Sequence, residues 1–145
     1  MKIILGDIGE YMPVISDLMR ENWEETGYDF KFSPSYETYV SLQAKGLMFA
    51  FFAIHDGRVV GYCTALVSRE LHNLEIVTCT SDALFVSKAY RNTTAGGRLI
   101  LAVEQEAVKR GAMRMRWTAK TGSTLHWTLE RRGYDASDIT LIKEF

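Results

Sequence analysis

The residues best suited to binding chemistry lie where an apolar run, residues 84–86, gives way to a polar, glycine-containing turn. Small residues at 95–97 then open an amphipathic helix pattern that reaches about Arg110. A helix start without bulky side chains leaves its first backbone N–H groups accessible, and the helix dipole adds partial positive charge there. Arg91 before the turn and Arg98 inside the helix add two formal positive charges. The segment therefore predicts a phosphate-binding loop.

The candidates for proton transfer lie on either side of this loop. Asp82 interrupts an apolar strand region, and strand alternation places its side chain on the same face as that of Leu84. A buried carboxylate is costly unless it is paired or exposed in a cleft, so Asp82 is the leading candidate base; an ion pair or a turn cap at a bulge explains it equally well. Glu75, further back on the segment, could relay protons through water. His126 titrates in a useful range, although a lone histidine more often satisfies a local contact.

Composition indicates one domain over residues 1–145, large enough to bury a core. No stretch approaches the length of a membrane span, and the first residues do not form a signal peptide. The two cysteines lie in apolar runs without metal-ligand spacing, which favours buried, reduced thiols and a cytoplasmic location. The formal net charge of −1 argues against a nucleic-acid partner.

The order of apolar periodicities and turn residues predicts a mixed α and β fold. Strands are expected over residues 2–5, 47–55, 58–68, 74–86, 113–118 and 139–145, and helices over 10–25, 34–46, 95–110 and 123–132. Asp56-Gly57 between two β-type runs is the clearest hairpin signal. Ser33 is the expected N-cap of the second helix, with Pro34 at its first position.

Two motifs resemble those of the GNAT N-acetyltransferases. The run Arg91-Asn92-Thr93-Thr94-Ala95-Gly96 is similar to the R/Q-x-x-G-x-G/A signature of that family, with Thr94 in place of the first glycine and Gly97 one residue beyond the second. The run from Leu129 to Tyr134 resembles the family's helix end Y-x-x-x-G-F/Y. The compact length and the run from Asp82 to Arg91 are also similar to those of phage-encoded members.

The element order β-α-α-β-β-β-α-β-α-β is that of the family as well, so the resemblance covers nearly the whole chain. It implies an α/β (α+β) GNAT fold with a single mixed, mostly antiparallel central sheet of six to seven strands and about four helices. It also implies an N-acetyltransferase that takes acetyl-CoA as its cosubstrate.

In the family, the glycine-containing loop holds the pyrophosphate of acetyl-CoA, and the backbone of the strand before it binds the pantetheine arm. The cofactor-binding residues implied here are Leu84, Phe85, Val86, Arg91, Asn92, Thr93, Thr94, Ala95, Gly96, Gly97 and Arg98. Ser123 would face the pantetheine or adenosine end, although it is also the best local helix cap. No metal is expected.

The implied reaction is direct attack by a primary amine in a ternary complex, because neither cysteine has a neighbouring histidine that would make it a nucleophile. The acceptor would be an amine-bearing small molecule or a protein lysine or N-terminus. The oligomeric state stays open, a homodimer included.

One departure from the family concerns the proton donor. The position of the family's tyrosine is Leu129, and a leucine cannot protonate a leaving thiolate. This favours a first alternative, a catalytically silent CoA-binding or protein-interaction module with the same fold. The basic later half suggests a second alternative, a toxin-type member that acetylates aminoacyl-tRNA, against which the net charge of −1 argues.

Overall fold

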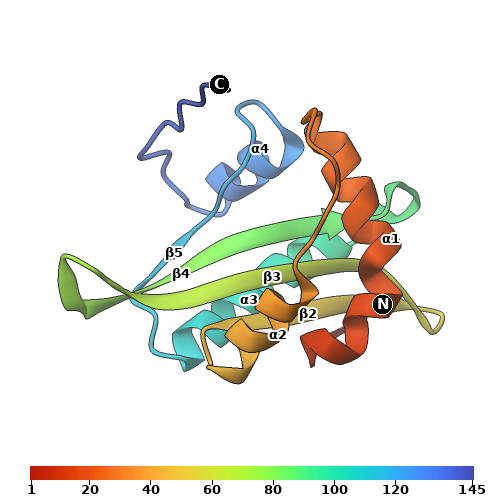
Figure 1. The fold of residues 1–145 in the computed structure, drawn as a ribbon, viewed down its shortest axis with the longest axis horizontal. Helices are drawn as coiled ribbons and strands as arrows, with labels where there is room; N and C mark the ends of the chain where they lie inside the picture. Colours follow the sequence, from red (N-terminus) through yellow and green to blue (C-terminus); the bar gives the residue numbers. More distant parts are fainter.

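The computed structural model describes all 145 residues and contains one five-stranded mixed sheet (Figure 1). In spatial order the strands are β1 (Lys2–Gly6), β2 (Met48–His55), β3 (Arg58–Glu70), β4 (Asn73–Val86) and β5 (Arg114–Arg116). The first four pair antiparallel, whereas β5 runs parallel to β4. The helices are α1 (Ile8–Thr26), α2 (Tyr36–Ala44), α3 (Ala95–Lys109) and α4 (Thr124–Arg131), with a 3₁₀ turn over Lys88–Tyr90. The predicted element order is thus confirmed as far as α4.

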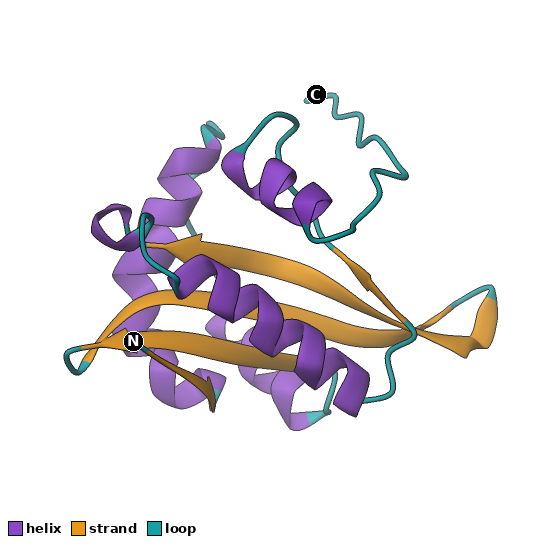
Figure 2. Ribbon diagram, turned by 180° about the vertical axis from the view of Figure 1, so that it is seen from behind, coloured by secondary structure: helices purple, strands orange, loops and turns teal.

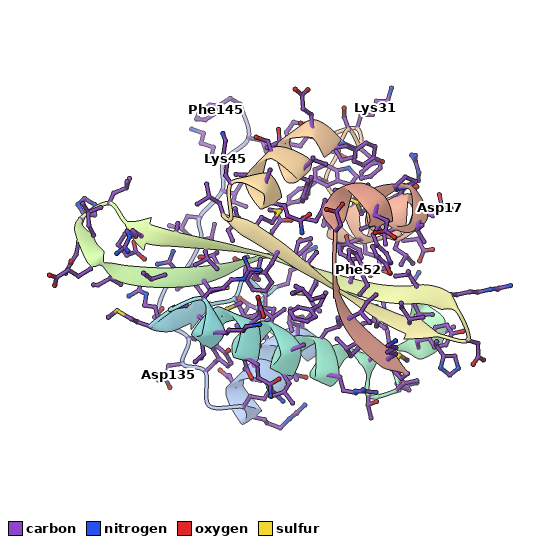
Figure 3. The ribbon with its side chains drawn as sticks, turned by 90° about the horizontal axis from the view of Figure 1, so that it is seen from below. Asp17, Lys31, Lys45, Phe52, Asp135 and Phe145 are labelled. Atoms are coloured by element: carbon purple, nitrogen blue, oxygen red, sulfur yellow. The ribbon has the colours of Figure 1, made fainter.

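The sheet is covered on both faces, and each face has its own apolar core. Helices α1 and α2 lie on one side of the sheet and α3 on the other, as Figures 2 and 3 show. Beneath α1 and α2 the buried residues include Met12, Ile15, Phe52, Tyr62 and Phe85. Beneath α3 they include Phe49, Cys63, Cys79, Leu99 and Val103. Because β2 and β3 contribute to both clusters, they read as nearly continuous apolar runs.

The ends of the first two helices follow from their capping residues. Asp7 accepts a hydrogen bond from the backbone N–H of Glu10 and begins α1, and Gly27, with φ of +72°, ends it in the left-handed region. The expected N-cap of α2 at Ser33 is wrong by two residues. Ser35 caps the helix instead, accepting from the backbone N–H of Thr38. Pro34, expected at the first helical position, therefore precedes the helix, which begins at Tyr36.

The expected strand over residues 139–145 does not form, and the sheet has five strands rather than six or seven. The segment makes no backbone hydrogen bond, and its chain end runs away from the sheet beyond α4 (Figure 1). Its apolar side chains are largely exposed, with Ile139 at 87% and Leu141 at 89%. A strand needs a partner as well as a suitable composition, and β5 offers only three paired residues.

The two cysteines lie in the core on the α3 side of the sheet, and both thiols are free. Burial raises the pKa of Cys79 to about 11 and raises the pKa of Cys63 as well. With a pKa of about 11, Cys79 carries a thiolate in about one molecule in a thousand at pH 8. Neither thiol is therefore a nucleophile near neutral pH.

Ellman's reagent at pH 8 is expected to label neither cysteine in the folded protein and both after denaturation, because only unfolding removes the burial that suppresses the thiolates. Rapid native labelling of one equivalent would contradict the buried placement of that thiol.

Gly61 sets the spacing between β3 and the end of β4. A Cβ at this position would lie 2.9 Å from the backbone oxygen of Phe85 and 3.2 Å from Cγ2 of Val86. The strands can approach this closely only because the residue has no side chain.

Gly61→Ala is expected to lower the free energy of unfolding by about 1–3 kcal/mol, since the new methyl group forces β4 outward. Urea denaturation measures the change. Gly97→Ala is the control for the glycine-to-alanine change without a close contact, because nothing lies within 4 Å of a Cβ there; it lies in α3 and should not lower stability. Equal stability of Gly61→Ala and wild type would contradict the close approach.

Candidate functional site

The central feature of the site is a gap that opens between β4 and β5. The two strands pair only from Thr78 to Thr80, opposite Arg114 to Arg116. One further contact follows, in which the backbone N–H of Thr118 donates to Oγ of Ser81 at 3.2 Å. Beyond it β5 diverges from β4 towards α4 (Figure 1). The last five residues of β4 therefore have a neighbouring strand on one side only.

The free edge of β4 presents backbone groups to this gap. Ser87 donates its N–H to Val60 of β3, and backbone groups alternate along a strand, so those of Val86 and Leu84 point away from β3. The carbonyl of Val86 already accepts from Nε of Arg91 at 2.9 Å. Among the three predicted strand-end residues, Leu84 therefore has both backbone groups free, Val86 has only its N–H free, and Phe85 pairs with β3.

The start of α3 carries unbonded backbone donors next to this edge. The N–H of Ala95 donates to Oγ1 of Thr93 and that of Thr93 to the carbonyl of Tyr90. The remaining loop amides, those of Asn92, Thr94, Gly96 and Gly97, donate to no protein group. Thr94 has φ of −78°, a value open to any residue, so threonine at the family's glycine position costs no backbone strain. The arrangement fits a phosphate.

Both loop arginines contact protein groups. Arg91 Nη2 lies 2.7 and 2.8 Å from the two carboxylate oxygens of Glu25 at the end of α1, and Lys88 lies 3.7 Å from the same carboxylate. Nη1 of Arg98 donates to the backbone carbonyl of Met1 at 2.6 Å. Glu25 offsets one positive charge, so Lys88, Arg91 and Arg98 together leave the loop with an excess of positive charge.

Asp82 lies at a β-bulge and faces the same gap. Thr64 pairs with Ala83 and Ala65 with Ser81, which leaves Asp82 as the extra residue. Its Oδ2 accepts hydrogen bonds from the hydroxyls of Tyr39 at 3.0 Å and Thr64 at 2.7 Å. Its Oδ1 has no protein partner. The expectation that Asp82 shares a face with Leu84 is wrong, because the bulge interrupts the strand alternation: Asp82 bonds to Tyr39 and Thr64 on the α1–α2 side, whereas Leu84 packs against the cluster beneath α3.

Two tyrosines beside Asp82 keep their protons at neutral pH. Burial, followed by the charge of Asp82 and the hydrogen bond to it, raises the pKa of Tyr39. Burial also raises the pKa of Tyr62 to about 12, although the hydrogen bond from Asn22 opposes that shift. The contacts of Tyr39 and Thr64 with Asp82 could not be predicted from the sequence, because the two residues lie 43 and 18 residues from Asp82 and carry no motif.

Asp82, Tyr39 and Tyr62 line a cleft of about 710 Å³. One wall comes from the end of α1 and the connection to α2, the floor from Tyr62 and the bulge of β4, and the other wall from residues after β5 and the start of α4. Asp82, Leu84 and Ser123 all line it. Ser123 caps α4 by accepting from the N–H of His126, so the capping interpretation is confirmed and its side chain also borders the cleft.

The other two candidate catalytic residues are not brought to this cleft. Glu75 is exposed near the tip of the β3–β4 hairpin, seven residues along the strand from Asp82, or roughly 23 Å at the usual rise. His126 uses both ring nitrogens within its own helix region, Nδ1 accepting from Gly122 N–H and Nε2 lying 3.2 Å from Glu130. Leu129, on the inner face of α4, is buried at 5% exposure.

Two further features of the structure concern metal ligation and membrane-spanning helices. No group of three or more histidine, cysteine, aspartate or glutamate side chains is placed to hold a metal ion. None of the helices combines the length and the apolar character that crossing a membrane requires.

Comparison with known proteins agrees with this geometry. Residues 15–134 match the model of the acetyltransferase (GNAT) family. A search of curated protein sequences finds no match. Solved structures with the same fold include the aminoglycoside acetyltransferase meta-AAC0020 from an uncultured soil metagenomic sample, 17% identical with a TM-score of 0.75, over 99% of this chain and 93% of that one.

Two further solved structures share the fold across nearly their whole length. The ribosomal-protein-alanine N-acetyltransferase from Brucella melitensis biovar Abortus 2308 is 16% identical with a TM-score of 0.74, over 100% of both chains. The aminoglycoside N-acetyltransferase AAC(6')-Iy in complex with CoA is 14% identical with a TM-score of 0.74, over 99% of this chain and 98% of that one. The family match spans most of the chain, and the protein belongs to the GNAT family of acetyltransferases.

Proposed function

We propose that the protein is an acetyl-CoA-dependent N-acetyltransferase in which a primary amine attacks directly within a ternary complex, and that residues 1–145 act as a single domain. The observation that carries the proposal is that the free edge of β4 and the unbonded amides at the start of α3 lie within one short stretch of chain, residues 84–97, with Asp82 two residues before it. Both ends of a cosubstrate with a polar arm and a pyrophosphate have matching protein groups along this stretch.

The cosubstrate supplies an activated acyl group as a thioester. The amides of Asn92, Thr94, Gly96 and Gly97 would hold its pyrophosphate, supported by the positive charge of Arg98. The free backbone groups of Leu84 and the N–H of Val86 would hold its pantetheine arm as an added strand does. Arg91 acts as a positioning residue, because it anchors the end of β4 through the carbonyl of Val86.

Asp82 would receive the acceptor amine. Tyr39 and Thr64 fix the carboxylate through Oδ2, and Oδ1 stays open for an ammonium group. An amine must be neutral to attack a carbonyl carbon, so Asp82 accepts the ammonium proton directly or passes it to water in the cleft. Buried Leu129 offers no proton to the leaving group, which leaves that step to solvent.

The acceptor would be a small-molecule amine or a protein lysine or N-terminus. The location proposed is the cytoplasm, supported by two buried thiols that are not paired in a disulfide. Leu129 also favours a second candidate function, a CoA-binding module without turnover. Thiol release with a panel of amines distinguishes the two candidate functions, because a module without turnover would bind acetyl-CoA but release no free CoA thiol.

Isothermal titration tests the cofactor loop. Wild type is expected to bind acetyl-CoA in the micromolar range. Arg91→Ala is expected to bind it about tenfold more weakly, because the end of β4 loses the charge-assisted hydrogen bond that Arg91 donates to the carbonyl of Val86. Arg69→Ala is the matched control, because Arg69 also donates to a backbone carbonyl but lies on the β3–β4 hairpin. If wild type does not bind acetyl-CoA, or if Arg91→Ala binds it with equal affinity, the role of this loop in binding the cosubstrate is contradicted.

Asp82→Asn tests the amine site. It is expected to lower kcat/KM for the amine by about 10²-fold, within the range for a positioned acid or base, with acetyl-CoA affinity unchanged. Activity should partly recover at high pH, where more of the amine arrives already neutral. Thiol release measured across pH reports both the loss of activity and its recovery. Thr64→Val removes one of the two hydrogen bonds that hold the Asp82 carboxylate, so it should have a smaller effect. A pH profile identical to that of wild type would remove Asp82 as the proton acceptor.

A further inference from the structure

We infer that the acceptor is a small monoamine, a molecule with one ammonium group on an apolar and preferably aromatic body. This inference rests on the proposed function and on three properties of the acceptor side of the cleft: its aromatic wall, its balance of charge and the bonds that several of its polar side chains already make to protein groups.

The aromatic wall is built by the end of α1 and the connection to α2. Trp23, Tyr28, Phe30, Phe32, Tyr39 and Tyr62 all line the cleft. The connection is held in place by Nε1 of Trp23, which donates to the carbonyl of Phe30 at 2.8 Å, and by Arg20, which lies 5.0 Å from the centre of the Phe32 ring. Phe30 is nonetheless 62% exposed. An apolar body placed here would remove this aromatic surface from water.

The charge in the cleft suits a single cation. The acidic lining residues are Glu25 and Asp82, and the basic ones are Lys31 and Lys120, so the formal charge of the lining is zero. Arg91 already pairs with Glu25, whereas Asp82 has no cationic partner. Lys31 forms no ion pair and lies at the outer margin of the α1–α2 connection, where Figure 3 labels it. One ammonium group can therefore pair with the free carboxylate of Asp82, whereas a second would be repelled by the lysine side chains of the lining.

Several polar side chains of the cleft already hydrogen-bond to protein groups. Asn22 donates to Tyr62, Thr26 to the carbonyl of Trp23, and Tyr39 to Asp82. Ser35, Ser81 and Ser123 each accept from a backbone N–H. A hydroxyl-rich acceptor would lose many bonds to water on entering the cleft, whereas the apolar body of a simple amine has none to lose.

The test compares 1-aminohexane with 1,6-diaminohexane, which differ mainly by a second ammonium group, and adds 2-phenylethylamine and glucosamine. With acetyl-CoA and thiol release as the readout, kcat/KM is expected to be about tenfold higher for 1-aminohexane and 2-phenylethylamine than for the other two. Equal or reversed preference would overturn the inference. Lys31→Glu should narrow the gap between the monoamine and the diamine, and an unchanged gap would contradict the role of Lys31.

The aromatic wall is tested with Phe30→Ala. Its KM for 2-phenylethylamine is expected to rise about fivefold with little change in kcat, because the side chain binds the body of the amine and not the reacting atoms. Leu71→Ala removes an equally apolar side chain, 93% exposed at the hairpin tip, and should change neither constant. An unaltered KM for Phe30→Ala would contradict binding of the amine by the aromatic wall.

A binding measurement without acetyl-CoA separates this inference from the proposed function. Trp23 and Trp117 both line the cleft, so tryptophan fluorescence can report binding of 2-phenylethylamine, with Asp82→Asn expected to weaken it. Amine binding without acetyl-CoA binding would overturn the proposed function and leave the inference standing. Acetyl transfer that prefers the diamine would overturn the inference and leave the proposed function standing. If the protein neither binds the amine nor transfers an acetyl group, both are overturned.

Discussion

The separation of β4 from β5 after Thr80 is the constraint on which the rest of the site depends. Continued pairing would consume the backbone groups of Leu84 and Val86 and close the cleft. Three features keep the strands apart: β5 pairs over three residues only, the bulge at Asp82 bends β4, and the chain after β5 turns away into α4. Gly61 then allows β3 to hold the end of β4 from the other side.

The ion pair between Arg91 and Glu25 has a positional role more than an energetic one. Both side chains are partly exposed, and pairs of this kind contribute about 1 kcal/mol or less to stability. Its geometry matters more, because the same guanidinium bonds to Val86 and so connects the end of α1, the end of β4 and the loop before α3. The wall of the cleft at the end of α1 and the loop before α3 are thereby fixed relative to each other.

Sequence reasoning predicted the features that depend on local residue type. The Asp56-Gly57 hairpin, the helix opening at Ala95 and the polar break at Asp82 are of this kind. It could not predict contacts between distant segments, such as Glu25 with Arg91 across 66 residues or Tyr39 with Asp82 across 43. The strand expected over residues 139–145 was wrong for a related reason, because β composition does not supply a partner.

The most direct test of the account is a proton–nitrogen correlation NMR titration of the protein with CoA. The backbone amides of Thr94, Gly96 and Gly97 donate to no protein group, so phosphate oxygens should move their proton resonances downfield as new hydrogen bonds form. The amide of Leu84 on the free edge of β4 should shift with them. Saturating CoA that leaves these four resonances in place, while others move, would contradict the site described above.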